Sequence, residues 1–498
     1  MNVNPITRLD YPDLDVIRVE DTYYMVSTTM HFMPGCEILQ SFDLVHWEHV
    51  TYVYETLDHT DAQQLKSGQN IYGQGMWAAS LRYHEDRFYI CFVANDTRKT
   101  YLYTSEKIDG PWKKQLIEGF YHDGSLLFDE DGRNYIVYGN DEIWITELNE
   151  DLTAPKKDGL HRLLVSDHKN PELGYEGSHI QKINGYYYIF LVHSLRDRWM
   201  RTEACFYSDS LEGEFTGGDV LCDDRGYCGQ GVAQGGIVDT PDGKWYAMLF
   251  QDFGAVGRIP ILLPVTWKDH FPFFGQNGHV PEEIEVHSTR PGYIYQPLVG
   301  SDDFCNGLLP RWQFNHDPDP RYYHLDALQG TYTITTREVC TELTQAVNTL
   351  TQRMSYPSCA AEVTVDASAL KEGDVAGLCA LQSCYAAVGI TKHHGKYEVL
   401  MLDKKEDGIL DMTEGTVVES HQMDFRLEAD FCNMKDEARC YYRVNKGDWL
   451  PIGTVHKLYF KLDHFTGCRF GLFCYAAEET GGSACFRDFK YYDVDEIS

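Results

Sequence analysis

Five segments in the first half of the chain share one pattern of polar and apolar positions. Each begins with an acidic or glycine-containing turn and continues into an apolar strand that an aromatic residue opens. The segments are VEDTYYMVSTT (19–29), HEDRFYICFVA (84–94), DEDGRNYIVYGN (129–140), INGYYYIFLVH (183–193) and PDGKWYAMLFQ (241–251). Their shared tyrosines, spaced 65, 46, 53 and 58 residues apart, are Tyr24, Tyr89, Tyr135, Tyr188 and Tyr246. This period fits a repeated unit of four short strands, and such units bury their faces only by stacking, so the pattern predicts a five-bladed β-propeller.

A second set of positions recurs in phase with these tyrosines. Eleven or twelve residues before each tyrosine stand Asp13, Trp77, Asp123, Glu176 and Gln234. In a blade built from hairpins, they fall at comparable points of the preceding strand, the one nearest the central axis. A single acid at such a point is more often a turn residue or a strand-end cap. Three acids in phase with a five-fold repeat favour side chains that face the axis, so the pattern predicts a funnel with three carboxylates, a tryptophan and an amide.

The second half of the chain has a different pattern. After residue 251 the repeat stops, and the Pro- and Gly-containing segment RPGYIYQPLVGS (290–301) predicts a linker. Short alternating segments follow, which predict a two-sheet β-sandwich of jelly-roll type: GTYTITT, AAEVTVDAS, KYEVLML, RLEADF, ARCYYRV, KLYFKLDHF, RFGLFCYA and CFRDFKYYDV. His393 and His394 in TKHHGKY are predicted to lie at a hairpin turn rather than to bind a metal, because adjacent strand residues point to opposite faces. The expected fold is all-β, with a propeller over 1–290, a linker over 291–301 and a sandwich over 302–498.

Composition narrows the partners and the compartment. The net charge of −33 disfavours nucleic acid and anionic membrane surfaces as partners. The N-terminus lacks the basic and apolar regions of a signal peptide, and no run of about 18 apolar residues predicts a membrane span. The 15 cysteines are odd in number, scattered and without a CxxC pair, which favours reduced thiols in a cytoplasmic protein over disulfides or a zinc site. Whether the chain forms a homo-oligomer stays open.

The motifs together resemble glycoside hydrolase family 43. The resemblance covers essentially the whole chain and rests on five ordered segments, with WQFNHDPDPRYYHL and AVNTLTQR in the second domain. These segments are DYPDLDVIRVEDTYYMVSTT, GMWAASLRYHEDRFYICF, YHDGSLLFDEDGRNYIVYG, YEGSHIQKINGYYYIF and QGGIVDTPDGKWYAMLFQ. The second domain is similar to the concanavalin A-like domain of that family's β-xylosidases. The resemblance implies a propeller that hydrolyses β-xylosides or α-L-arabinofuranosides with inversion.

The resemblance also assigns roles to residues. It implies that Asp13 is the general base, that Glu176 is the general acid and that Asp123 orients this acid and tunes its pKa. Independently of the resemblance, an ionised Asp123 near Glu176 would raise the pKa of Glu176 by like-charge repulsion. The resemblance further implies substrate contacts for a set of polar and aromatic residues: Trp77, Arg258, His31, Phe32 and Gln234. For Trp77 the alternative is core packing. For Arg258, which follows two glycines and is expected on an exposed loop, the alternative is a surface salt bridge.

Two departures from the family pattern bear on chemistry. Leu14 follows Asp13 where the family usually has proline, which leaves the carboxylate in place. Gln234 stands where many members have a histidine near a central water or calcium ion. Glutamine cannot supply an imidazole ligand, so no cofactor and no metal ligands are expected, and a structural Ca²⁺ in the propeller channel is not favoured.

The predicted activity is removal of terminal pentoses from small neutral oligosaccharides by an inverting exo-β-xylosidase or α-L-arabinofuranosidase. The catalytic motifs do not choose between xylose and arabinose, and they leave open whether the sandwich only covers the propeller or lends a loop to the pocket. Fructan and sucrose hydrolases share the domain plan, but their Asn-Asp-Pro-Asn and Arg-Asp-Pro motifs are missing from the propeller segment. The alternative is an inactive carbohydrate-binding propeller, which predicts the loss of a funnel acid.

Overall fold

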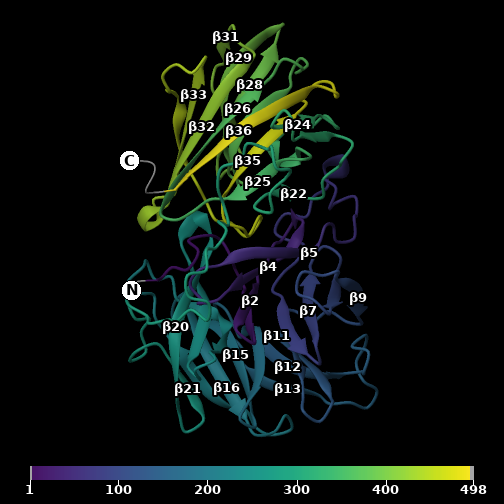
Figure 1. Cartoon of the computed structure of the whole chain (residues 1–498), viewed down its shortest axis with the longest axis vertical. Coiled ribbons are helices and arrows are strands. Elements are labelled where there is room, and N and C mark those ends of the chain that lie inside the picture. Colours follow the sequence, from purple (N-terminus) through teal and green to yellow (C-terminus); the bar gives the residue numbers. More distant parts are fainter. Residues whose placement is uncertain (1–2, 494–498) are drawn as a thin grey trace.

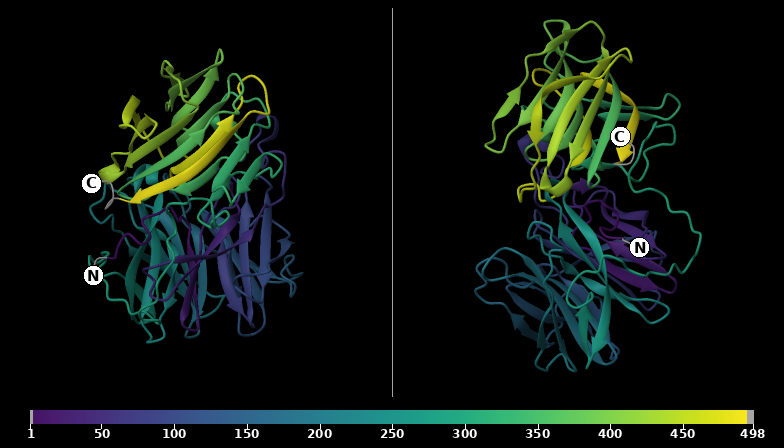
Figure 2. Two further views of the ribbon diagram at one scale, coloured as in Figure 1. Left: turned by 45° about the horizontal axis from the view of Figure 1, so that its top comes forward. Right: turned by 90° about the vertical axis from the view of Figure 1, so that its left-hand side faces the viewer.

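A computed structural model describes residues 3–493 of the chain. Two all-β domains are stacked along the long axis, the N-terminal domain below the C-terminal one in Figure 1, and the side view in Figure 2 shows the same stacking. The short 3-10 helices are η1 (Lys66–Gly68), η2 (Gly254–Val256), η3 (Leu343–Gln345) and η4 (Cys432–Met434). None of the helices in this range is long and apolar enough to span a membrane.

The N-terminal domain consists of five four-stranded antiparallel sheets, which are the predicted propeller blades. The first blade contains β1 (Asp15–Val19), β2 (Thr22–Val26), β4 (Gly35–Ser41) and β5 (Glu48–Tyr54). The second contains β6 (Ser80–His84), β7 (Arg87–Ala94), β8 (Lys99–Ser105) and β9 (Lys113–Ile117). The third contains β10 (Ser125–Phe128), β11 (Asn134–Asn140), β12 (Glu142–Leu148) and β13 (His161–Ser166). The fourth contains β14 (Glu176–Ile183), β15 (Tyr186–Ser194), β16 (Arg201–Ser208) and β17 (Thr216–Leu221). The fifth contains β18 (Ala233–Asp239), β19 (Trp245–Asp252), β20 (Arg258–Lys268) and β21 (Phe271–Phe274).

The recurring tyrosines explain why the blades are equivalent. Each lies in the second strand of its blade and pairs with the inner strand, as Tyr24 does with Ile17 and Tyr246 with Val238. The inner strands contact one another in a ring, and β1 contacts β18, so the first blade meets the last. The segment before β1 reinforces this closure, because the Ile6 N–H donates to the Pro260 oxygen of β20 at 2.8 Å.

The C-terminal domain is a sandwich of two larger sheets, as the alternating segments predicted. One sheet has the order β3-β22-β25-β35-β27-β28-β29-β30, with β31 also paired to β29. Its strands are β3 (Phe32–Met33), β22 (Gln313–Asn315), β25 (Leu350–Arg353), β27 (Val375–Leu381), β28 (Ala386–His393), β29 (Lys396–Lys404), β30 (Leu410–Met412), β31 (Thr416–Val418) and β35 (Arg469–Tyr475). The other sheet has the order β23-β24-β36-β26-β32-β33-β34. Its strands are β23 (Tyr323–Asp326), β24 (Thr331–Thr335), β26 (Ser358–Asp366), β32 (Gln422–Asp430), β33 (Glu437–Val444), β34 (Leu450–Lys457) and β36 (Ser483–Asp493). His393 pairs with Lys396, which confirms the predicted hairpin turn.

The first blade contributes a strand to the sandwich. Between β2 and β4 the chain forms β3, and Met33 pairs there with Phe314 of β22. The two domains therefore share a sheet as well as a surface. The domain limits at 290 and 302 stay a prediction, and the outer ends of both domains, at 1–2 and 494–498, lie outside the described residues.

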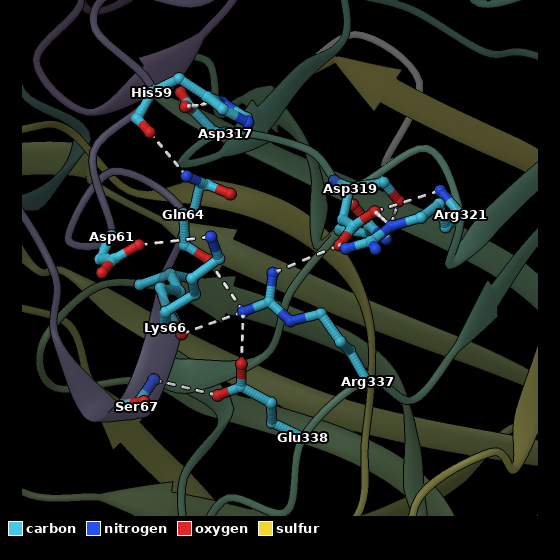
Figure 3. A network of polar contacts seen from close by, with 12 residues as sticks. His59, Asp61, Gln64, Lys66, Ser67, Asp317, Asp319, Arg321, Arg337 and Glu338 are labelled. Carbon is cyan, nitrogen blue, oxygen red and sulfur yellow. Dashed lines mark hydrogen bonds and ion pairs between the residues drawn. The ribbon is translucent and has the colours of Figure 1, made fainter.

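A polar network joins the loop after the first blade to the sandwich (Figure 3). The Arg337 guanidinium is nearly buried and donates to the backbone oxygen of Gln64 at 2.9 Å. His59 Nδ1 lies 2.7 Å from Asp317 Oδ2. Because Arg337 and Asp317 belong to the sandwich segment, these contacts fix the loop at residues 59–67 against that domain.

One predicted sandwich strand is wrong. The segment KLYFKLDHF (457–465) alternates as a strand should, yet β34 ends at Lys457 and the following residues form an irregular segment. Phe460 and Phe465 of this segment contact the propeller: the Arg258 guanidinium lies 5.9 and 4.3 Å from their ring centroids, and the Phe465 and Trp77 centroids are 5.5 Å apart. In this segment the pattern of apolar and polar residues therefore did not indicate a strand.

Candidate active site

The five in-phase residues lie where the inner strand of each blade begins. Asp13, Trp77 and Asp123 come two or three residues before β1, β6 and β10, Glu176 opens β14, and Gln234 is the second residue of β18. The inner strands of all five blades run in the same direction, so their first residues lie at the same end of the ring. The fold thus brings these residues to one end of the propeller axis, as the repeat predicts.

The backbone at these points adopts an uncommon conformation. Asp13, Asp123 and Gln234 have φ of 51°, 48° and 65°, in the left-handed region that side chains other than glycine seldom occupy. Hydrogen bonds between blades stabilise it: the Gly177 N–H donates to Asp123 Oδ2 at 3.1 Å, and the Gln234 N–H donates to Glu203 Oε2 at 2.7 Å.

Asp13 is held by two donors. Thr28 Oγ1 donates to Asp13 Oδ2 at 2.8 Å, and Arg258 Nη1 donates to Oδ1 at 2.9 Å. The Asp13 side chain is only 8% exposed. Both carboxylate oxygens thus have a fixed orientation, which suits a group that must aim at one water molecule.

Glu176 and Asp123 form a second group, with His122 beside them. His122 Nε2 lies 3.6 Å from Asp123 Oδ2 and 3.6 Å from Glu176 Oε2. The Asn140 side-chain amide donates to Glu176 Oε2 at 2.6 Å. The Glu176 side chain is 20% exposed and that of Asp123 is 6% exposed. Glu176 is thus the more open of the two acids, and Asp123 lies beneath it.

The acids and His122 shift one another's pKa values. The pKa of Asp123 is raised to about 6, mainly by burial and also by the carboxylates of Glu176 and Asp13, while His122 opposes the shift. The Asp123 carboxylate, helped by Glu176 and Asp13, raises the pKa of His122 to about 9. The sequence predicted an ionised Asp123 beside Glu176, and that role stays a prediction. The structure adds His122, whose raised pKa makes it the cation next to the two acids.

A cavity of about 580 Å³ opens above Glu176 and Trp77. Phe460 and Phe465 of the sandwich also line it, so the second domain does lend a segment to the pocket. Trp77 is half-buried and its ring centroid lies 5.9 Å from that of His122. Trp77 is therefore placed as the sequence predicted, on the wall of the cavity next to the acids.

The expected environment of Arg258 is wrong. It is 1% exposed, at the first position of β20, rather than on an exposed loop. Its guanidinium lies 4.3 Å from the Phe465 ring centroid and donates to Asp13, so an aromatic ring and a carboxylate enclose it. The preceding glycines are needed for close approach, because a Cβ at Gly257 would meet the Asp10 side chain at 2.4 Å. Arg258 therefore orients Asp13 from beneath the cavity.

His31 and Phe32 are also not where the resemblance placed them. They are 0% and 2% exposed, and neither lines the cavity. Phe32 lies in β3 and its ring is covered by the Arg469 guanidinium at 3.5 Å. The His31 ring packs against His316 and Tyr72, at centroid distances of 4.9 and 4.7 Å. The loop that should reach the sugar is used instead to join the two domains.

Gln234 is buried beside the start of β14. It is 5% exposed, packs against Gly177 and is not among the residues that line the cavity. Within residues 3–493, the one group of three ligand-type side chains close enough to share an ion is His122, Asp123 and Glu176. These are two acids of the site and the adjacent histidine, whose raised pKa of about 9 disfavours the neutral imidazole that a metal ion needs.

The sequence missed several residues of the site. His122 directly precedes Asp123 in HDGSL, and Asn140 ends the strand of the third repeat, so both lay within recognised motifs. Phe460 and Phe465 were assigned to a strand. Their role has no local signal, because it depends on how the domains pack.

The chain matches two family models. Residues 3–272 match the glycosyl hydrolases family 43, and residues 301–492 match the β-xylosidase C-terminal concanavalin A-like domain. A β-xylosidase of Formosa agariphila is 26% identical over 99% of this chain and 89% of its own length. A non-reducing end α-L-arabinofuranosidase of Bacteroides ovatus is 23% identical over 82% of this chain and 79% of its own length.

Solved structures agree over nearly the whole chain. A bifunctional GH43-CE protein of Bacteroides eggerthii has a TM-score of 0.92 and 42% identity over 99% of this chain. This chain spans 63% of that protein. A GH43 glycoside hydrolase engineered to display endo-xylanase and exo-arabinofuranosidase activity has a TM-score of 0.87 and 28% identity, with 99% of each chain covered.

Proposed function

Because the chain belongs to glycoside hydrolase family 43, an inverting family, we propose that it removes terminal pentoses from β-1,4-xylosides and α-L-arabinofuranosides. The observation that supports this best is the group of Asp13, Asp123 and Glu176 at one end of the propeller axis, where Glu176 lines a cavity and Asp13 and Asp123 are buried behind its lining. Inversion needs one carboxylic acid at the leaving oxygen and one carboxylate that activates water on the opposite face of the sugar.

Glu176 is the proposed general acid and Asp13 the proposed general base. Glu176 lines the cavity and is the more exposed acid, so its oxygen can reach a glycosidic oxygen. Asp13 lies deeper, with Thr28 and Arg258 fixing its two oxygens. It comes from the first blade and Glu176 from the fourth, so the two groups approach the sugar from different walls. His122 Nε2 lies 3.6 Å from oxygens of both Glu176 and Asp123, so a positive charge stands next to the proposed acid.

The proposed substrates are short neutral oligosaccharides cleaved at a terminal sugar. Phe460 and Phe465 narrow the cavity from the sandwich side, which favours a chain end over the middle of a polymer. The aromatic walls suit the C–H face of a pentose. All three acids are in place, which disfavours an inactive binding propeller.

We also propose a cytoplasmic location and activity without a cofactor. The 15 cysteines are all free thiols, which suits a reducing compartment. Whether the chain forms a homo-oligomer stays open, and light scattering would measure its oligomeric state.

A product assay on short xylo- and arabino-oligosaccharides tests the proposal. We expect release of xylose or arabinose, one unit at a time, from the non-reducing end. Binding of these sugars without release of any pentose would contradict it and favour the inactive propeller.

A further inference from the structure

The propeller has a second cavity, of about 410 Å³, at the end of its axis away from the acids. Its lining comes from the inner strands of all five blades, with Trp245 of β19 added. The last residues of four inner strands line it: His84, Phe128, Ile183 and Asp239. The three acids stand where inner strands begin, so this cavity opens at the opposite end of the ring. We call it the far mouth.

A buried polar network separates the far mouth from the acids. Arg82 of the second blade donates from Nη1 to Asp15 Oδ2 of the first blade at 2.7 Å. From Nη2 it donates to Ser125 Oγ of the third blade at 2.7 Å and to the Ile180 oxygen of the fourth at 3.1 Å. These bonds join the inner strands of four blades within the ring. The far mouth also shares none of its described lining residues with the cavity at Glu176, so it is a separate site without the acids.

The lining of the far mouth is aromatic and open to solvent. Tyr83 is 41% exposed. The rings of His84 and Phe128 are stacked, with centroids 4.6 Å apart and an interplanar angle of 9°. All described lining residues belong to the propeller, whereas the sandwich contributes to the cavity at the other end. Flat, accessible rings in a cavity of this size suit a ligand with an apolar face, such as a sugar ring.

The charges of the far mouth are paired within the protein. Each arginine and lysine of its lining contacts a carboxylate, in the pairs Arg18–Asp239, Arg82–Asp15 and Lys182–Asp129. An anionic ligand would have to compete with one of these carboxylates, and a cationic ligand with one of the basic groups. Gln181 donates from Nε2 to the Ile237 oxygen at 2.8 Å, which directs its amide and leaves Oε1 as an acceptor for a hydroxyl. This lining favours a neutral, hydroxylated ligand.

We propose that the far mouth is a second, noncatalytic binding site for a neutral oligosaccharide, whose sugar rings stack on Tyr83 and on the His84–Phe128 pair. The choice of pentose oligomers as ligands rests on the proposed function, whereas the choice of a neutral sugar rests on the lining. Because the polar network around Arg82 separates the two ends of the axis, one chain can bind both sugars at once.

Calorimetry with xylohexaose and arabinohexaose tests the proposal. In Glu176→Gln, used to prevent turnover, we expect two binding sites per chain for at least one of these sugars. Adding Tyr83→Ala should raise the Kd of one site about tenfold, equivalent to about 1.4 kcal/mol, and leave the other unchanged. Tyr83→Phe keeps the ring and should keep the affinity. His84→Ala removes one ring of the stacked pair and should weaken the same site, which gives a second reading if Tyr83→Ala lowers the melting temperature.

Two controls define the site and its ligand. Phe273→Ala should change neither affinity, since Phe273 is 49% exposed on β21 and does not line the far mouth. Hexagalacturonate, an anionic sugar chain, should show no binding that depends on Tyr83. Binding of this anion as tight as that of the pentose oligomers would overturn the assignment of a neutral ligand.

The outcomes separate this site from the proposed function. A single site in Glu176→Gln, or two sites that Tyr83→Ala and His84→Ala both leave unchanged, would overturn the proposal. If the unmodified chain releases pentose in that case, the proposed function stands without the second site. Tyr83-dependent binding by a chain that releases no pentose would instead support the far mouth and contradict the proposed function.

Discussion

Replacement of His122 by glutamine tests how the site holds its catalytic proton. His122 Nε2 lies 3.6 Å from oxygens of both Asp123 and Glu176, and its pKa is raised to about 9, so it is cationic at neutral pH. Two unit charges at that distance interact by about 5 kcal/mol at an effective dielectric constant of about 20. This corresponds to roughly 3 pKa units, which sets an upper limit. Water reaches the Glu176 side, so we expect a net effect of about one to two units.

The expected change is an upward shift of the alkaline limb of kcat/KM in His122→Gln. Loss of a nearby cation disfavours ionisation of the acids, so the enzyme should stay active further into the alkaline range. The assay is a pH profile with an unactivated disaccharide, whose leaving group needs the proton. His161→Gln is the control, because His161 stacks on Trp144 on an outer strand, remote from the acids. An unchanged limb, or a shift to lower pH, would refute the assigned charge of His122.

Three further predictions address roles, metal and stability. Glu176→Gln should slow hydrolysis of oligosaccharides by roughly 10²–10⁴-fold but spare aryl pentosides with good leaving groups. Asp13→Asn should slow the hydrolysis of both substrate classes. Rates measured against leaving-group pKa check this, and the reverse pattern would exchange the two roles. Thorough EDTA treatment should leave turnover largely intact, and loss that added Ca²⁺ restores would contradict the inference from Gln234. Burial lowers the pKa of His464 to about 4 and that of His316 well below its usual range. Below about pH 6.5 the unfolded chain therefore binds more protons than the folded one. The folded state should lose stability as the pH falls from there towards 4. The melting temperature should therefore drop over that range and drop less in His464→Phe, which keeps the ring that stacks on Tyr72; an equal drop would show that His464 is not responsible.

The propeller and the position of its acids could be predicted because the signal is repeated. Tyr24 and its four equivalents fix the phase of each blade, and Asp13, Asp123 and Glu176 keep a constant offset from that phase. A single copy would not distinguish an axial acid from a turn residue. The sandwich could be predicted for a similar reason, since alternation recurs over many short strands.

The contacts between distant segments could not be predicted in this way. Arg258 follows two glycines, which locally indicate an exposed loop, but Asp13 and Phe465 bury it from segments more than 200 residues away. The family resemblance assigned Phe32 a substrate contact, and pairing of β3 with β22 takes it into the domain interface. For both residues, the contacts in the folded protein depend on segments that are distant in the sequence, so the local sequence does not reveal them.

The same contacts indicate that the sandwich is part of the catalytic apparatus. Asp10 Oδ1 accepts the Arg258 N–H at 2.7 Å, and its Oδ2 accepts the Gly467 N–H of the sandwich at 2.8 Å. Burial raises the pKa of Asp10, so this link lies in a water-poor interface. Arg258 also donates from Nη2 to the Phe465 oxygen at 3.3 Å, and from Nη1 to Asp13. The orientation of the proposed base therefore depends on the segment that the sandwich inserts, and a displacement there would reach Asp13 through two hydrogen-bonded residues. The sandwich therefore does more than cover the propeller, because it forms a hydrogen bond to the arginine that positions the proposed base.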